Sequence, residues 1–350
     1  MTPHTPVFCS IVPPHLLEQL ARSSNPAVAA AARRTLIADA SARTTRVLPL
    51  PGSAPTLAPA DTGRPHRTVY DCGRGTELPG VRVRAEGEEA TGDATVNRAY
   101  AGLGATFDLF LNAFGRDSID GAGLPLLASV HYDENYGNAF WNGEQMVFGD
   151  GDDEIFLDFT LPVDVIGHEL AHGFTQHTAN LEYFSQSGAL NESVSDVFGS
   201  LVKQYALGQN AQDADWLIGE GLFHPNVEGT ALRSMKAPGT AYDDDVLGKD
   251  PQPGHMDDYV RTSRDNGGVH INSGIPNHAF YLAATELGGN AWERPGQIWY
   301  DVMTGGTLTP ETRFSEFAAA TVAAAKARYG DGEEIQAVLK AWSAVGVPTD

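Results

Sequence analysis

Residues 165–174 read VIGHELAHGF, a stretch with two histidines and a glutamate close together. His168 and His172 stand four positions apart, and Glu169 directly follows the first histidine. In a helix, side chains four positions apart lie on one face, so both imidazoles can bind one tetrahedral zinc ion. Glu169 lies about 100° around the helix, where its carboxylate can contact a water molecule on that ion. The spacing predicts a zinc-binding helix.

A third ligand decides between a zinc site and an ordinary helix, because a catalytic zinc requires three protein ligands. The pattern HExxHxxGxxH is excluded, since Thr175 and Thr178 stand where it requires glycine and histidine. The segment GALNESVSD (188–196) offers Glu192, 20 residues after the second histidine. Asp196, one helical turn further on, can accept the N–H of a ligand histidine. We therefore interpret Glu192 as the third ligand and Asp196 as the carboxylate that supports a ligand histidine.

A second group of residues lies in DNGGVHINSGIPNH (265–278). The double glycine predicts a tight turn that presents His270, with Asp265 near enough to orient its ring. The alternative is a loop histidine with no catalytic role. Amide hydrolysis, however, requires a donor that stabilises the oxyanion opposite the metal, and His270 is the candidate for it.

Composition narrows the class of protein. The chain has 350 residues, a net charge of −22 and two cysteines, Cys9 and Cys72. The negative charge argues against nucleic acids and anionic membranes as partners, and no window approaches the ~18 apolar residues of a membrane span. The N-terminal MTPHTPVFCSIVPPH has no basic region, and its apolar run is shorter than the ~7–15 residues of a signal peptide. A standard secretory signal is not expected, which leaves export by another route open.

The N-terminal part has its own organisation. Residues 1–44 are expected to be helical, with Pro14 and Pro26 each at the start of a helix. Residues 45–66 are rich in proline, alanine and threonine and predict an exposed linker, where proteolytic nicking concentrates.

The rest of the chain divides into two lobes. Short β-type runs fill residues 67–160, interrupted by one helical pattern at 97–115, and from residue 162 the chain is mostly helical. The sequence predicts an α+β fold with a β-rich lobe (67–164) and an α-helical lobe (165–350). The zinc helix falls at their junction, a usual place for a cleft.

Four segments together carry a resemblance to a known family: HELAH, GALNESVSD, NAFWNGEQMVFGDGD and DNGGVHINSG. In this order and spacing the chain resembles the thermolysin-like zinc metalloproteases over residues 67–350, including the run IWYDVMTGGTLTPETRFSEF. The resemblance implies a two-lobed zincin. It implies that the zinc ligands are His168, His172 and Glu192, and that the general base acting on the zinc-bound water is Glu169. It also implies that the oxyanion donors are His270, held by Asp265, and Tyr183.

The resemblance further implies how substrate binds. Asn138 and Ala139 match positions that bind the substrate backbone, and Arg233 matches the arginine that contacts the carbonyl beyond the scissile bond. The leaving-group pocket would be lined by apolar residues, which favours cleavage before a bulky hydrophobic residue. The residues that match this pocket are Phe156, Phe159, Val165, Ile218 and Leu232. Each of them is equally explicable as part of the hydrophobic core.

The sequence departs from the family pattern at its calcium sites. The paired site would include Asp164, Asp215 and Glu220, but Lys203 and Leu217 occupy two of its carboxylate positions. An ammonium group among the remaining carboxylates can replace cation charge by a salt bridge. A further calcium site of the family would be weakened in this chain by Thr230. We expect reduced or absent calcium dependence.

The N-terminal leader also departs from the pattern of the secreted family members, which have a long propeptide. FCSIVPPHLLEQLA resembles the short propeptide of protealysin-type members, so residues 1–66 are interpreted as a propeptide with its linker, removed on maturation. Cys9 is open to two readings. Its thiolate is a good zinc ligand, and equally a small buried cysteine needs no role beyond packing.

The hypothesis is a secreted, monomeric zinc endopeptidase made as an autoinhibited zymogen, acting on peptides and proteins and inhibited by its own propeptide. One rival is a zinc aminopeptidase, which requires an acidic cluster for a free α-amine; we recognise no motif that supplies it. The other rival is an inactive binding protein. Intact Glu169 and His270 argue against it, since a lost activity would require neither.

Overall fold

A six-stranded mixed sheet forms the N-terminal lobe of the computed structural model, which describes residues 9–47 and 63–349. The strand order is β1-β5-β6-β4-β2-β3. The central strand β4 runs parallel to β2 and β6, and the other neighbours are antiparallel. The strands are β1 (Cys9–Ser10), β2 (Arg67–Asp71), β3 (Val81–Ala85), β4 (Leu126–Val130), β5 (Ala139–Trp141) and β6 (Met146–Phe148).

Helix α3 (Ala94–Phe114) packs against β2, β4 and the following helix. The helix expected at 97–115 is confirmed, and it starts earlier because the Asp93 side chain accepts hydrogen bonds from the N–H groups of Thr95 and Val96. Its apolar face is buried, which joins the sheet to the helical lobe.

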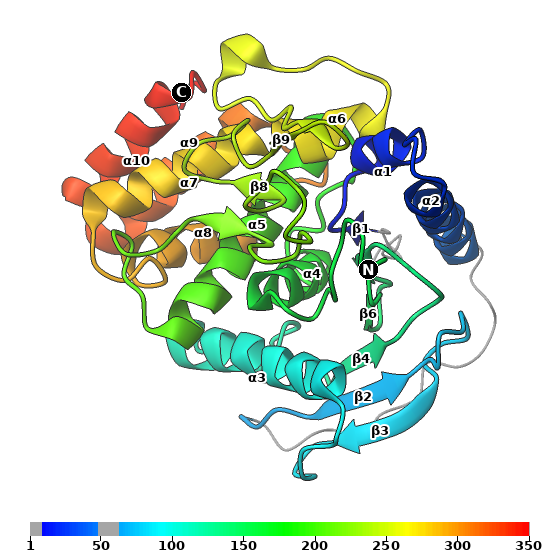
Figure 1. The fold of residues 1–350 in the computed structure, drawn as a ribbon. Helices are drawn as coiled ribbons and strands as arrows, with labels where there is room; N and C mark the ends of the chain where they lie inside the picture. The colour runs from blue at the N-terminus through cyan, green and yellow to red at the C-terminus, as the bar shows by residue number, and fades with distance from the viewer. Residues whose placement is uncertain (1–8, 48–62, 350) are drawn as a thin grey trace.

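The centre of the molecule is the helix pair α4 (Val163–Gln176) and α5 (Ser185–Leu207), between the sheet and the C-terminal helices (Figure 1). Glycine permits the close approach of the two helices. A Cβ atom on Gly199 would lie 2.6 Å from the carbonyl oxygen of Asp164. This contact brings the histidines of α4 within reach of the acidic residues of α5.

The C-terminal lobe continues through five helices, of which the first four contact α5 and the last packs on the second and fourth. They are α6 (Asp265–Asn272), α7 (Gly274–Leu287), α8 (Arg294–Thr304), α9 (Phe314–Tyr329) and α10 (Glu333–Ala344). The expectation of mostly helix needs refinement before α6, where the chain forms two small two-stranded sheets and a 3-10 turn. One of these sheets is a short hairpin whose turn is held by the Asp244 side chain. These elements are β7 (Leu217–Ile218), β8 (Arg233–Ser234), β9 (Asp243–Asp244), β10 (Gly248–Lys249) and η1 (Met256–Asp258). The predicted α+β, two-lobed architecture is confirmed.

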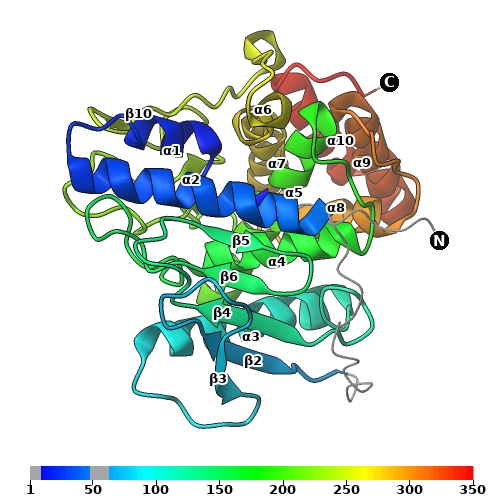
Figure 2. The same cartoon turned by 90° about the vertical axis from the view of Figure 1, so that its right-hand side faces the viewer.

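The leader forms helices α1 (Pro14–Leu20) and α2 (Pro26–Val47), each beginning at its predicted proline. Figure 2 shows them across the side of the molecule where the sheet and the C-terminal helices meet. Two expectations are corrected. Cys9 and Ser10 form strand β1, because their backbone pairs with β5, and α2 continues to Val47, past the expected start of the linker at residue 45. Most of that linker lies outside the described residues.

Candidate active site

Three predicted ligands converge from the central helix pair. The Nε2 atoms of His168 and His172, both on α4, lie 3.0 Å apart. A carboxylate oxygen of Glu192, on α5, lies 3.6 Å from the first of these nitrogens, and the other oxygen lies 3.5 Å from the second. All three side chains are buried. Their spacing matches a single small ion bound between them.

The outer partners of the histidines fix which nitrogens face inward. The Nδ1 atom of His168 lies 2.7 Å from Asp196 Oδ1, and that of His172 lies 2.8 Å from Asn191 Oδ1. Both Nδ1 atoms therefore carry the proton, and both Nε2 atoms turn lone pairs toward each other. Burial lowers the pKa of His172 to about 3, which keeps its ring neutral. Two facing lone pairs and a buried carboxylate fit a divalent cation such as zinc.

Glu169 lies beside this group and is fully buried. Its Oε2 accepts a hydrogen bond of 2.8 Å from the backbone N–H of Trp141 on β5. Burial and the nearby charge of Glu192 raise its pKa well above the ordinary value, and the N–H groups of Trp141 and Ile11 oppose that rise. A cation held by the neighbouring ligands would also favour the ionised form. The carboxylate is thus held against β5, near the predicted metal ligand Glu192.

His270 is presented by the predicted turn. Within α6, Gly267 and Gly268 have φ angles of 86° and 80°, so the double-glycine turn is confirmed. A Cβ atom on Gly267 would also lie 3.1 Å from the Ser185 backbone. The Nδ1 of His270 lies 2.6 Å from Asp265 Oδ1, and its backbone N–H donates to Oδ2 at 2.9 Å. The geometry therefore fixes the ring of His270.

The charge of His270 follows from its neighbours. Burial alone would lower its pKa, but the carboxylates of Asp265 and Glu192 raise it to about 9. The Tyr183 hydroxyl lies 3.2 Å from His270 Nε2 and donates to Glu192. A protonated imidazole and a phenol thus stand together beside Glu192.

The residues predicted to bind substrate backbone all contact the leader. Asn138 and Ala139 accept hydrogen bonds from leader N–H groups, and Arg233 donates to a leader carbonyl. The guanidinium also forms a buried pair with Asp196. The five predicted pocket residues are buried in the main apolar core, which also contains Ile11 of the leader: Phe156, Phe159, Val165, Ile218 and Leu232.

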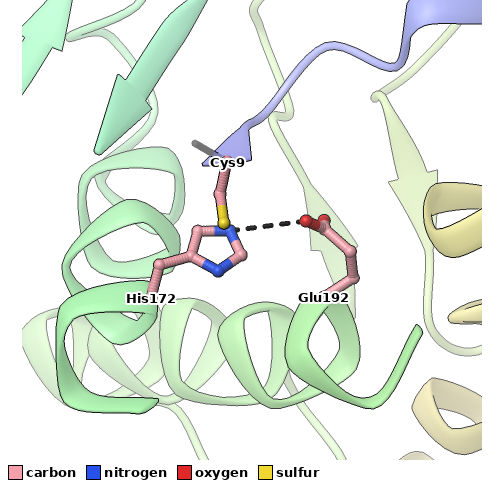
Figure 3. A group of neighbouring side chains, drawn as sticks. All are labelled: Cys9, His172 and Glu192. Atoms are coloured by element: carbon pink, nitrogen blue, oxygen red, sulfur yellow. Dashed lines mark ion pairs between the residues drawn. The ribbon is translucent and has the colours of Figure 1, made fainter. Parts of the chain in front are cut away.

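Cys9, from β1, meets the ligand group. Figure 3 shows its sulfur beside the ring of His172, with Glu192 opposite. Ligand atoms of these three residues lie within 4.8 Å of one another, and all three are buried. The thiol is therefore positioned to share a metal ion with the histidine and the carboxylate.

Several supporting residues escaped the sequence analysis. Trp141 holds Glu169 through its backbone, and Asn191 and Ser195 hold His172. Asn277 donates to Asp196 at 2.8 Å. All four lie inside the motifs quoted above. Their closeness in sequence to the predicted site residues is the signal that could have identified them.

The predicted calcium cluster is organised around an ammonium group. Lys203 Nζ lies 2.6 Å from Asp215, 3.1 Å from Glu220 and 3.5 Å from Asp164. The three carboxylates raise the pKa of Lys203 against the effect of its burial. Leu217 donates its backbone N–H to Asp215 at 2.8 Å, and the Thr230 hydroxyl donates to the Ala241 carbonyl.

Comparison with known proteins agrees with this geometry. Residues 53–176 match the family described as thermolysin metallopeptidase, catalytic domain, and residues 179–347 match its alpha-helical domain. The extracellular metalloprotease of Pectobacterium carotovorum subsp. carotovorum is 50% identical over 340 residues, covering 97% of this chain and 96% of that protein. Protease PrtS of Photorhabdus sp. (strain Az29) is 51% identical over 284 residues, covering 81% and 76%.

A solved structure, the precursor of protealysin, a metalloproteinase from Serratia proteamaculans, superposes with a TM-score of 0.89. It is 51% identical, and the match covers 97% of this chain and 99% of that one. Fold and site together define a metalloendopeptidase in zymogen form. The chain belongs to the thermolysin metallopeptidase family.

Proposed function

We propose that this chain is a zinc-dependent neutral endopeptidase made as an autoinhibited zymogen. The observation that carries the proposal is the convergence of two imidazole lone pairs and one carboxylate beside a buried glutamate, in a cleft that the leader fills. The proposed zinc ligands are His168, His172 and Glu192. The proposed divisions are leader and linker (1–66), β-rich lobe (67–164) and helical lobe (165–350).

Zinc, when bound by these ligands, would supply a polarised carbonyl and a water of lowered pKa. Glu169 takes the proton of the attacking water and later delivers it to the leaving amine. Its bond to the Trp141 N–H keeps the carboxylate oriented toward the cleft. Asp196 and Asn191 keep both histidine rings in the tautomer that binds metal.

The charge that develops on the substrate carbonyl is stabilised by His270 and Tyr183. Asp265 holds the imidazole in position, and the raised pKa keeps it protonated at neutral pH. Donors fixed before the reaction contribute more than mobile ones, because no reorganisation is needed in the transition state.

Substrate is held by Asn138, Ala139 and Arg233, whose polar groups face the cleft side of β5 and β8. The leaving-group side chain enters an apolar pocket, proposed to be lined by Phe156, Phe159, Val165, Ile218 and Leu232. This supports cleavage before a bulky hydrophobic residue, since burial of such a side chain contributes about 1.5–3 kcal/mol.

The leader inhibits by occupying this cleft, with Cys9 near the metal ligands. The proposed partners are peptide and protein substrates and this propeptide, with the protein acting as a monomer and not on nucleic acid or membranes. No helix of the described ranges 9–47 and 63–349 is long and apolar enough to cross a membrane. Two of the relatives carry names that call them extracellular, which supports secretion. Calcium dependence is expected to be reduced or absent, because Lys203 supplies positive charge in the paired site.

The proposal is tested with an internally quenched peptide blocked at both ends. Purified chain is assayed before and after linker proteolysis, beside Glu169→Ala, with and without a zinc chelator. Activity should appear only after leader removal and disappear with chelator or substitution. Blocked ends exclude an aminopeptidase. If no sample cleaved the peptide although one zinc ion was bound per chain, the proposal would be refuted.

A further inference from the structure

The leader backbone crosses the cleft in a defined register. Strand β1 pairs antiparallel with β5, with Ser10 opposite Phe140. The N–H of Ile11 donates to the Ala139 carbonyl at 3.1 Å, and the Ile11 carbonyl accepts from Arg233 at 2.9 Å. These contacts place Ile11 as the residue that follows a scissile bond.

The next residue continues the same register. The N–H of Val12 donates to Asn138 Oδ1 at 2.9 Å. Ile11 and Val12 are both fully buried and belong to the apolar core that contains the proposed pocket residues. The leader thus contacts all three residues proposed to bind substrate backbone: Asn138, Ala139 and Arg233.

The Ser10–Ile11 peptide group is held at both ends by residues of the proposed site. The Ser10 carbonyl oxygen lies 3.0 Å from His270 Nε2, the proposed oxyanion donor. On the other side of the bond, the Ile11 N–H donates to the carbonyl of Ala139, one of the residues proposed to bind substrate backbone. A misregistered inhibitor would not satisfy both ends of one peptide bond.

We propose that Ser10–Ile11 is a peptide bond held in the scissile position, and that the Cys9 thiol keeps it from being hydrolysed. This rests on the proposed function. The sulfur lies with the ligand atoms of His172 and Glu192, where it excludes the attacking water. The leader is therefore a bound substrate of the enzyme, protected by the residue before the bond.

The reaction that the thiol prevents is an ordinary hydrolysis. One water adds to the Ser10 carbonyl carbon, with Glu169 taking its proton, and the C–N bond to Ile11 breaks. The proton passes to the departing amine. The products are a fragment ending in the Ser10 carboxylate and a chain that begins at Ile11.

The test uses full-length zinc-loaded chains carrying Cys9→Ala or Cys9→Ser. Cys72→Ala, which changes the other cysteine, and Cys9→Ala/Glu169→Ala are the matched controls. Intact mass and N-terminal sequencing should find Ile11 as the new N-terminus in both Cys9 variants, at a rate independent of protein concentration. Wild type and both controls should keep the bond.

A folded Cys9 variant with bound zinc that keeps Ser10–Ile11 intact overturns the proposal, as does a released leader that still contains this bond. A quenched-peptide assay on the mature enzyme separates this failure from failure of the proposed function. If the mature enzyme cleaves the peptide while the Cys9 variants keep the Ser10–Ile11 bond, the inference about the leader is wrong and the proposed endopeptidase function stands.

A second readout does not depend on turnover. In cobalt-substituted wild type and Cys72→Ala, a thiolate ligand should give a sulfur-to-cobalt charge-transfer band in the near ultraviolet. The band should disappear in Cys9→Ser. Its absence from wild type would refute the protective role of Cys9.

Discussion

Arg233 and Asp196 form a buried ion pair through two hydrogen bonds of 2.8 Å each. Asp196 also holds the ring of His168, and Arg233 also holds the leader carbonyl of Ile11. One ion pair therefore connects a proposed metal ligand with the leader backbone, so a change in either residue is expected to affect both.

Arg233→Met should lower the free energy of unfolding by about 3 kcal/mol, because it leaves the Asp196 carboxylate buried without its cation. The same change at Arg328, whose pair with Asp301 is partly exposed, should cost at most about 1 kcal/mol. Urea unfolding of the full chains measures both. Equal losses would contradict the importance assigned to the buried pair.

Lys203→Gln should destabilise the chain and create a calcium response. Removal of the ammonium leaves three carboxylates together, one of them fully buried, at a cost of about 3–5 kcal/mol. Millimolar calcium should restore part of this stability in the variant and leave wild type nearly unchanged. Thermal unfolding with and without calcium tests it.

The exposed pair Lys340–Glu286 provides the control for the lysine experiment. Lys340→Gln should lower stability by less than about 1 kcal/mol and show no calcium response beyond that of wild type. A calcium stabilisation of equal size in wild type and Lys203→Gln would show that the ammonium does not replace a cation.

Acid should weaken leader docking through His15. Both ring nitrogens of His15 are buried without a hydrogen-bond partner in the described structure. Burial lowers its pKa from 6.5 to about 4, with Asp265 opposing and His270 and Arg233 adding to the effect. A lowered pKa means that docking is at full strength above about pH 6.5 and weakens as pH falls toward 4, by up to roughly 300-fold.

Hydrogen exchange of the leader amides, corrected for intrinsic rates, measures that weakening between pH 7 and pH 4. His15→Gln, which keeps a polar side chain but cannot titrate, should show a smaller loss of protection. An unchanged pH dependence in the variant would assign the effect to other groups.

Alkali should weaken the β-rich lobe through His131. Its ring lies 2.7 Å from Asp150 and 2.9 Å from Asp93, and Arg74 approaches Asp150 at 3.8 Å. The bond to Asp150, opposed by burial, raises the pKa of His131 to about 9. The raised pKa gives stability that is complete below about pH 6.5 and is lost as pH rises through 9.

The size of that loss is modest, on the order of 1 kcal/mol, because Asp93 is partly exposed and solvent screens the pair. Urea unfolding of wild type and His131→Asn between pH 6 and pH 10 measures it. The variant should lose the alkaline decline; a decline of the same size in both proteins would contradict the prediction.

Much of the site could be predicted because its signals are local. The spacing within HELAH places two imidazoles on one helical face, and the double glycine before His270 predicts the turn that the φ angles confirm. Strand β1 could not be predicted. Two residues carry no periodicity, and they are extended only because the edge of β5 offers hydrogen bonds to them.

The family that the chain resembles, and the residues proposed to bind metal and to take a proton, follow from the sequence alone. Short-range periodicity encodes these, because a helix fixes the positions of neighbours within a turn or two. The register in which the leader lies across the site depends on the tertiary structure. The contacts of His270 with Ser10 and of Arg233 with Ile11 span 260 and 222 residues. Such pairings follow from how the leader packs on the finished fold, so no local pattern in the chain specifies the bond it presents.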